Sequence, residues 1–204
     1  MGDLVRAAAV DADVLVVDDR STDSSREIAA ANGARVLQAA CPGYDGALDT
    51  GLRKAFADGY VWVVTMDGDG EHDPALVARF REILQQGSPL VCGVRRRPQR
   101  VAEYIVAALG RMLFGTKDLL CGMKGYSRPV LERHFDSGAA LAINMAPVIG
   151  WRRAGGAFVE VAVTGTPRKD RPRFARALDA NRTILMAFCR ATVQARPRRK
   201  AVGR

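Results

Sequence analysis

Short apolar runs alternate with longer amphipathic stretches along most of this chain. The clearest run is Tyr60–Met66 (YVWVVTM), whose continuous apolar character is typical of a strand covered on both faces. Further strand-like runs are Val14–Asp18, Ala34–Ala39, Pro89–Val94 and Phe158–Val163. Helix-like stretches lie before, between and after these runs: Gly2–Val10, Ser21–Asn32, Gly46–Ala57, Asp73–Gly87, Val101–Phe114 and Ala177–Val193. This alternation predicts one α/β domain with a mostly parallel sheet flanked by helices.

Two of the helix starts carry capping signals. Ser24 and Glu27 have the spacing of a capping box, and Asp73 followed by Pro74 provides an N-cap residue and an N1 proline. We therefore expect the second and fourth helices to begin at or near these residues.

Acidic residues follow two of the predicted strands. Asp18 and Asp19 end the first strand, and Asp67, Asp69 and Glu71 follow YVWVVTM. Ligands of open α/β sheets collect at the carboxyl ends of strands. In an extended backbone residues i and i+2 point the same way, so the last three carboxylates are expected to converge. Because converging carboxylates repel one another without a cation, the pattern predicts a Mg²⁺ or Mn²⁺ site, the alternative being a polar turn that caps the next helix.

Composition and charge limit the class of protein, its cell compartment and its binding partners. The chain has 204 residues, is 48% apolar and 26% charged, and contains no apolar run of 18 residues and no secretory signal pattern. Its four cysteines are widely spaced, which argues against a zinc site or a disulfide framework and favours a reducing cytosol. The net charge of +9 is uneven, since residues 1–151 carry −2 and residues 152–204 carry +11. This basic excess predicts a polyanion, a membrane surface or phosphate groups as partner, or else a solvated tail.

Two families of phosphotransfer proteins also place acids at strand ends. A receiver domain would use Asp67 as its phosphoacceptor, but it needs a later strand that ends in Lys, and none is seen. Haloacid-dehalogenase-type phosphatases carry Asp-x-Asp-Gly after an apolar strand, as in Asp67–Gly70, but near the chain start and followed by Thr or Val. Both interpretations leave either VDDRSTD or EHDP unexplained.

Four segments in order match a third family better. VLVVDDRSTDSS, GYDGALDTGLRKAFADG, VVTMDGDGEHDP and DLLCGMKGYSRPVLE together resemble the family 2 glycosyltransferases of GT-A fold, most closely the polyprenyl-phosphate (dolichol-phosphate) mannosyl- or glucosyltransferases. The resemblance runs from about Val14 to Phe174. It implies a GT-A (nucleotide-diphospho-sugar transferase) domain at 1–175, followed by a C-terminal amphipathic helix and basic tail at 176–204. It also implies metal-dependent, inverting transfer of a sugar from a GDP- or UDP-linked donor to an acceptor, with a polyprenyl phosphate favoured.

The resemblance also implies roles for individual residues. Those expected to bind the nucleotide-sugar are Asp18, Asp19, Ser21, Asp67, Arg168 and Arg173. Those expected to hold Mg²⁺ or Mn²⁺ are Asp67, Asp69 and Glu71. Arg95 and Arg100 match arginines that hold the acceptor phosphate, and Asp118 matches an acid on the acceptor side. Asp69 and Asp118 are the expected catalytic residues, with Asp118 as the base if the acceptor is an alcohol.

Some features depart from the family pattern. The first family strand and its nucleobase loop are not found before Gly2–Val10, which would leave a strand edge unpaired. We therefore expect a start further upstream, a degenerate domain that binds the donor weakly, or a partner chain that fills the place. Rival hypotheses are a non-catalytic relative that acts through its basic C-terminus and an aspartyl-phosphate phosphotransfer or phosphatase domain. Nucleic acid is not the expected partner, because the basic tail lacks interleaved aromatic residues. The expected location is the cytoplasm, and contact of the closing helix with the inner face of the membrane is a further hypothesis.

Overall fold

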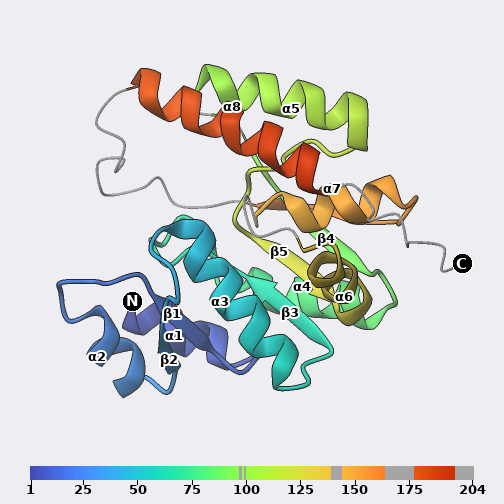
Figure 1. The fold of residues 1–204 in the computed structure, drawn as a ribbon. Coiled ribbons are helices and arrows are strands. Elements are labelled where there is room, and N and C mark those ends of the chain that lie inside the picture. The colour runs from blue at the N-terminus through green and yellow to red at the C-terminus, as the bar shows by residue number, and fades with distance from the viewer. Residues whose placement is uncertain (97, 99, 139–143, 164–176, 196–204) are drawn as a thin grey trace, which may run out of the picture.

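The computed structural model describes residues 1–96, 98, 100–138, 144–163 and 177–195 (Figure 1). Its helices are α1 (Gly2–Ala9), α2 (Ser25–Ala31), α3 (Tyr44–Ala57), α4 (Leu76–Gln85), α5 (Val101–Phe114), α6 (Arg128–Asp136), α7 (Ala146–Arg153) and α8 (Ala177–Gln194). Its strands are β1 (Leu15–Asp18), β2 (Arg35–Gln38), β3 (Trp62–Thr65), β4 (Leu90–Arg95), β5 (Lys124–Ser127) and β6 (Val159–Val163). The predicted α/β class is confirmed, and α5 has the predicted bounds.

The described strands form two sheets. β1 and β2 pair in parallel, and the second sheet has the order β3-β5-β4-β6. Within it β3, β4 and β6 run in one direction, while β5 runs antiparallel to β3 and β4. Three of the four strands thus share one direction, as predicted, but β5 lies between β3 and β4 and makes two of the three pairings antiparallel. β5 was missed because its sequence, KGYS, has neither an apolar run nor an apolar alternation.

The core lies on both faces of the four-stranded sheet. Leu90 and Cys92 of β4 point into the cluster formed with α5, α6, α7 and α8, whereas Val91 points into the cluster formed with α4. This alternation follows from the two-residue period of a strand. It fixes the orientation of β4, and thereby the place of Arg95 at its end.

Helices connect the two sheets. In α1, Val5 packs in the small cluster around β1 and β2, while Ala8 packs in the cluster below β3 and β4. α3 contacts both β1 and β3. At the start of these strands the Tyr60 hydroxyl donates a hydrogen bond to Asp13 Oδ2 at 2.6 Å. In the described part of the chain, no strand pairing joins β1 to β3.

The capping predictions need correction. α2 begins at Ser25, directly after the predicted cap residue Ser24, but Ser24 makes no side-chain cap hydrogen bond. Asp23 Oδ1 accepts the Ser25 N–H at 3.0 Å. α4 begins at Leu76, two residues beyond the predicted proline, and Asp73 Oδ1 accepts the Ala75 N–H at 3.0 Å. Each short side chain satisfies a backbone donor in the turn before the helix. None of the described helices is both long and apolar enough to span a membrane.

Candidate active site

The loop after β1 is held by its own carboxylates. Asp18 is buried, and its Oδ1 accepts the Ser21 N–H at 3.1 Å, while its Oδ2 lies 3.8 Å from Arg26 Nε. Both oxygens of Asp19 accept the Gly43 N–H, at 2.9 and 3.0 Å. Asp18 Oδ2 is buried and has no hydrogen-bond partner in the described part of the chain. An acceptor of this kind can receive a donor from a bound molecule.

The start of α3 joins this loop to the loop after β3. Gly43 is bound by Asp19, and the next residue, Tyr44, lies beside Asp67. Burial of the Tyr44 hydroxyl and the charge of Asp67 raise the pKa of Tyr44 well above its usual value, although about half of the residue is exposed. The two acid-bearing loops therefore meet at the N-terminus of α3.

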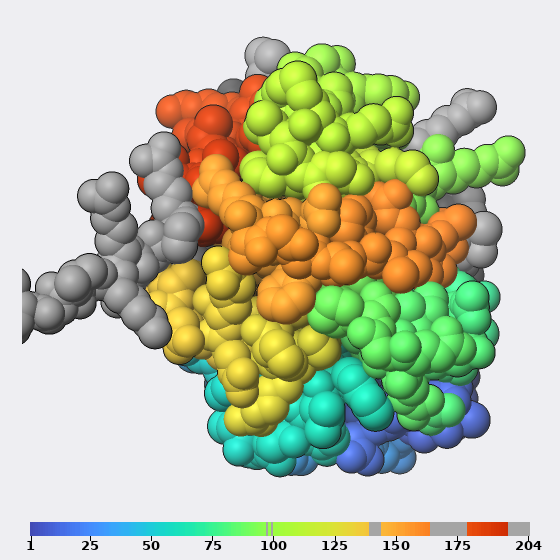
Figure 2. All heavy atoms as spheres, turned by 90° about the vertical axis from the view of Figure 1, so that its right-hand side faces the viewer, coloured from blue at the N-terminus to red at the C-terminus, as the bar shows by residue number. Residues whose placement is uncertain are grey.

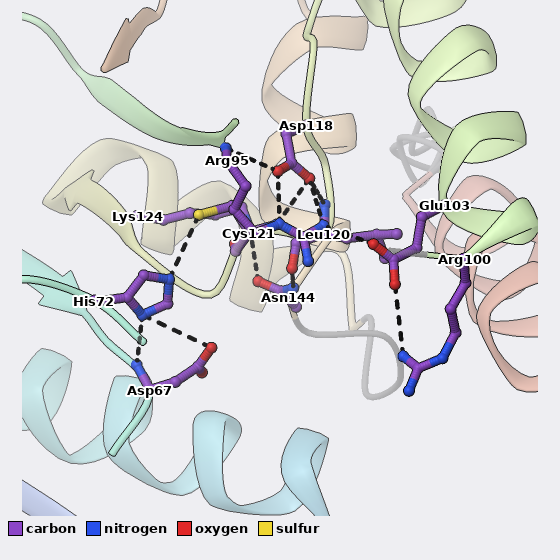
Figure 3. A network of polar contacts seen from close by, with 10 residues as sticks. All are labelled: Asp67, His72, Arg95, Arg100, Glu103, Asp118, Leu120, Cys121, Lys124 and Asn144. Atoms are coloured by element: carbon purple, nitrogen blue, oxygen red, sulfur yellow. Dashed lines mark hydrogen bonds and ion pairs between the residues drawn. The ribbon is translucent and has the colours of Figure 1, made fainter. Parts of the chain in front are cut away.

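His72 fixes the backbone after β3 (Figure 3). The Asp67 N–H donates to His72 Nδ1 at 3.3 Å, and the same nitrogen lies 3.8 Å from Asp67 Oδ2. On the other side of the ring, Nε2 lies 3.8 Å from Cys121 Sγ. Since His72 is buried, the ring holds the first residue of the acidic loop against the segment after α5.

The carboxylates after β3 do not converge as the strand alternation predicts. β3 ends at Thr65, and Gly70 has a positive φ of 82°, so the backbone turns before the alternation can continue. In this turn Asp69 Oδ1 accepts the Glu71 N–H at 3.0 Å. Among the described residues, no three His, Cys, Asp or Glu side chains are grouped closely enough to hold a metal ion. We refer to the loops after β1 and β3 as the acidic loops. Their acids are Asp18, Asp19, Asp67, Asp69 and Glu71.

A second set of charges lies at the end of β4 and is paired. Arg95 donates from Nε to Asp118 Oδ2 at 2.8 Å and from a terminal nitrogen to Asp118 Oδ1 at 3.1 Å. Asp118 Oδ1 also accepts the N–H groups of Leu120 and Cys121, both at 3.0 Å (Figure 3). This carboxylate therefore fixes both an arginine and a loop.

Glu103 holds the two predicted phosphate-binding arginines on one buried carboxylate. It lies 3.4 Å from Arg95 and 3.5 Å from Arg100, measured between terminal nitrogens and carboxylate oxygens. Glu103 belongs to the first turn of α5, and Arg100 is the residue before that helix. We call Arg95, Arg100, Glu103 and Asp118 the ion-pair network. The sequence analysis missed Glu103 because it was an isolated acid in an apolar helix.

Pairing determines how the network residues titrate. Burial raises the pKa of Asp118, but the hydrogen bonds and charge of Arg95 outweigh this and hold it below its usual range. Burial likewise opposes the charge on Arg95, but Asp118 and Glu103 outweigh it and raise the Arg95 pKa. A carboxylate with a lowered pKa is a weak base, so the geometry favours Asp118 as the residue that orients Arg95.

Two further polar residues support the segment after Asp118. Lys124 is fully buried on β5, and its ammonium donates to the Cys121 carbonyl and, at 2.6 Å, to Asn144 Oδ1. Asn144 in turn donates to the Leu120 carbonyl at 3.0 Å. Burial lowers the pKa of Lys124. Neither residue belongs to a periodic pattern in the sequence.

Gly122 brings the acidic loops and the ion-pair network together. A Cβ at this position would lie 2.2 Å from Asp67 Oδ2, so the Asp67 carboxylate packs directly against the backbone of the segment that follows Asp118. Asp67 is thus linked through Tyr44 and Gly43 to the loop after β1, and through Gly122 to the network. The predicted residues Arg168 and Arg173 lie outside the described residues.

Comparisons of the sequence with known proteins give a family and two named relatives. Residues 4–135 match the family model described as "Glycosyl transferase family 2". The polyprenol monophosphomannose synthase of Mycolicibacterium smegmatis is 32% identical over 189 residues, which cover 76% of this chain and 67% of that protein. The undecaprenyl-phosphate mannosyltransferase of Micrococcus luteus is 28% identical over 146 residues, covering 63% of this chain and 60% of that protein.

The fold is also similar to a solved enzyme structure. Glucosyl-3-phosphoglycerate synthase from Mycobacterium tuberculosis, crystallised with Mn²⁺, UDP-glucose and phosphoglyceric acid, superposes with a TM-score of 0.72 at 22% identity. The match covers 93% of this chain and 74% of that chain. The predicted GT-A fold is confirmed by this likeness.

Proposed function

Because the chain belongs to glycosyltransferase family 2, we propose that it transfers a sugar from a nucleoside diphosphate to a polyprenyl phosphate. The observation that carries the proposal is the continuous row from the acidic loops, through Asp67 and Gly122, to the arginines of the ion-pair network. One end offers carboxylates to a cation-bound diphosphate, and the other offers guanidinium groups to a second phosphate. The two matched relatives carry names of enzymes that act on polyprenol or undecaprenyl phosphate.

The acidic loops are the proposed donor side. Mg²⁺ in phosphate-binding sites commonly takes one or two protein carboxylates and completes its shell with phosphate oxygens and water. Asp67, whose side chain is 29% exposed, and Asp69, in the exposed turn, fit this requirement, and Glu71 is proposed as a weaker third ligand. When bound, a divalent cation would stabilise the charge that builds up on the leaving diphosphate.

The nucleoside would lie over the loop after β1. Asp18 Oδ2 accepts no hydrogen bond within the described residues, and we propose that a ribose or base donates one to it. Asp19 and Ser21 are proposed to contact the same nucleoside. Arg168 and Arg173 are proposed to cover the diphosphate, since guanidinium groups bind two phosphate oxygens at once.

The ion-pair network is the proposed acceptor side. Arg95 and Arg100 are held together by Glu103, which fixes two guanidinium groups before a ligand arrives. A lipid phosphate is already an anion and can attack without first losing a proton. The lowered pKa of Asp118 therefore favours a phosphate acceptor over an alcohol, which would need a stronger base.

Calorimetry tests the donor side first. UDP and GDP are titrated into the wild-type chain, into Asp69→Asn and into the control Asp136→Asn, each with and without Mn²⁺. We expect Mn²⁺-dependent binding of one nucleotide, lost in Asp69→Asn and kept in the control. No binding of either nucleotide to folded protein would contradict the proposal.

Transfer assays then separate the acceptors. Polyprenyl phosphate and the corresponding alcohol are offered with the nucleotide-sugar that binds. We expect product only with the phosphate, and equal rates with both acceptors would contradict the proposed acceptor class.

A further inference from the structure

The outward face of α5 is apolar along the length of the helix. Large side chains on this face are 42% to 72% exposed, and they are Val101, Tyr104, Ile105, Met112 and Leu113. Val101, Tyr104, Ile105, Met112 and the exposed Ala108 recur at the three- and four-residue spacing that places side chains on one side of a helix, and Leu113 directly follows Met112. We call these six residues the α5 stripe. Figure 2 shows α5 at the top of the molecule, with its side chains at the surface.

Of the exposed charged residues on α5 and on the described part of α8, three are arginines and one is acidic. Arg111 is the exposed charged residue of α5, and the helix's acid, Glu103, is buried against the arginines of the network. The neighbouring α8, which packs against α5, exposes Arg182 and Arg190 together with Met186 and Val193. Asp179 is the exposed acid in the described part of α8. A surface helix of a water-exposed domain ordinarily presents charged and polar residues on this side.

The stripe begins at the proposed acceptor site. Val101 follows Arg100 directly, and Glu103 lies between the exposed positions 101 and 104 but on the opposite, buried side of α5. The first turn of one helix thus presents apolar side chains outward and holds the phosphate-binding arginines inward.

We propose that the α5 stripe docks on an anionic lipid bilayer. An amphipathic helix with apolar side chains on one face and arginines beside them binds in the plane of the membrane interface. Arginine favours anionic headgroups, which identifies the surface chemistry. The value of this contact to the enzyme rests on the proposed function, because docking through α5 would bring Arg95 and Arg100 to the depth of lipid phosphates. The contact itself requires neither donor nor acceptor.

Vesicle flotation tests the proposal without either substrate. The vesicles are phosphatidylcholine alone or mixed with phosphatidylglycerol, and they contain no polyprenyl phosphate. The test variant is Tyr104→Glu with Met112→Glu. The control is Val10→Glu with Ile28→Glu, which makes the same change in charge at exposed apolar residues near α1 and on α2, away from α5 (Figure 1). Attraction through the basic residues at 196–204 falls equally in both variants, because it depends on net charge.

We expect the wild type to float with anionic vesicles, the α5 variant to lose about 10-fold or more in partition coefficient, and the control to stay within about 2-fold. Absence of wild-type binding, equal losses in the two variants, or equal binding to neutral vesicles would overturn the proposal. Light scattering that shows a dimer lost only in the α5 variant would overturn it in favour of an interface between copies.

A transfer assay with a short, water-soluble prenyl phosphate separates this proposal from the proposed function. If the α5 variant keeps this activity but no longer floats, both proposals are supported. If the wild type floats through α5 but transfers no sugar to the soluble acceptor, the docking surface stands and the proposed function fails.

Discussion

The acidic loops and the ion-pair network lie next to each other but differ in how their carboxylates are paired. In the network each carboxylate contacts an arginine, and Asp118 also accepts backbone N–H groups. In the acidic loops, Asp18 keeps a buried oxygen without a hydrogen bond, and Asp69 lies in an exposed turn. The carboxylates of the network are paired with arginines, whereas we propose that the acidic loops also bind a cation and a nucleotide.

This difference predicts that substitutions in the two regions affect stability to different extents. Substitutions in the acidic loops should change ligand binding and rate while the fold persists. Substitutions in the network should change the free energy of unfolding, because they leave a buried charge without its partner.

The largest expected effect comes from Asp69→Asn in the acidic loops. We expect kcat/KM to fall about 10³-fold, because the cation that offsets charge on the leaving diphosphate is lost. Urea unfolding should give a free energy close to that of the wild type. If Asp69→Asn lowered the free energy of unfolding as much as a substitution in the ion-pair network, the two regions would not differ in their contribution to stability.

Asp118→Asn tests the network. Removing this charge leaves the partly buried Arg95 guanidinium with Glu103 as its remaining ion-pair partner among the described residues, so we expect the free energy of unfolding to fall by about 3 kcal/mol. The exposed pair Arg128–Glu132 provides the control, and Glu132→Gln should cost less than about 1 kcal/mol.

The effect of Asp118→Asn should also depend on pH. Because the Asp118 pKa is lower in the folded chain, its contribution is present above the ordinary carboxyl pKa and is lost as the pH falls through the folded value. The difference between wild type and variant should therefore shrink in acid. A constant difference would contradict the charge-pair explanation.

His134 offers a further comparison with the ion-pair network, because it is a buried titratable side chain without a hydrogen-bond partner among the described residues. Neither ring nitrogen has a hydrogen bond within the described residues, and burial lowers the His134 pKa to about 4. The unfolded chain binds this proton below about pH 6.5, whereas the folded chain does not until about pH 4. Stability should therefore fall by about 3 kcal/mol between these pH values. Urea titrations of wild type and His134→Phe at pH 7 and 4.5 measure it, and parallel losses would contradict the assignment.

Glu71→Gln should have the smallest effect. Since the described residues contain no three-carboxylate cluster, we expect the apparent affinity for Mn²⁺ in the nucleotide titration to change less than about 3-fold. A tenfold loss would instead place Glu71 in the metal shell once a nucleotide is bound.

The sequence predicted those parts of the molecule that rest on local pattern. The bounds of α5 follow from its apolar period, and β4 from its continuous apolar run. The site is less predictable because it depends on contacts between distant segments. Glu103 was not distinguishable from a surface acid until Arg95 and Arg100 were seen on either side of it.

The acids after β3 show where the local rule ends. The rule that i and i+2 share a side holds only while the strand lasts, and β3 ends two residues before Asp67. Lys124 lies in a four-residue strand with no apolar alternation, so its burial depends on the neighbouring strands β3 and β4.

Sheets transmit folding cooperativity through their hydrogen-bond ladders, and in the described part of the chain the ladder stops between β1 and β3. The unit built from α1, β1, α2 and β2 is therefore expected to open at a lower free energy than the four-stranded unit. This smaller unit carries Asp18 and Asp19, while Asp67 belongs to the other. A nucleotide that binds Asp18, Asp19 and Asp67 would then contact both units and stabilise the smaller one against opening. It should therefore slow amide hydrogen exchange most in residues 1–40.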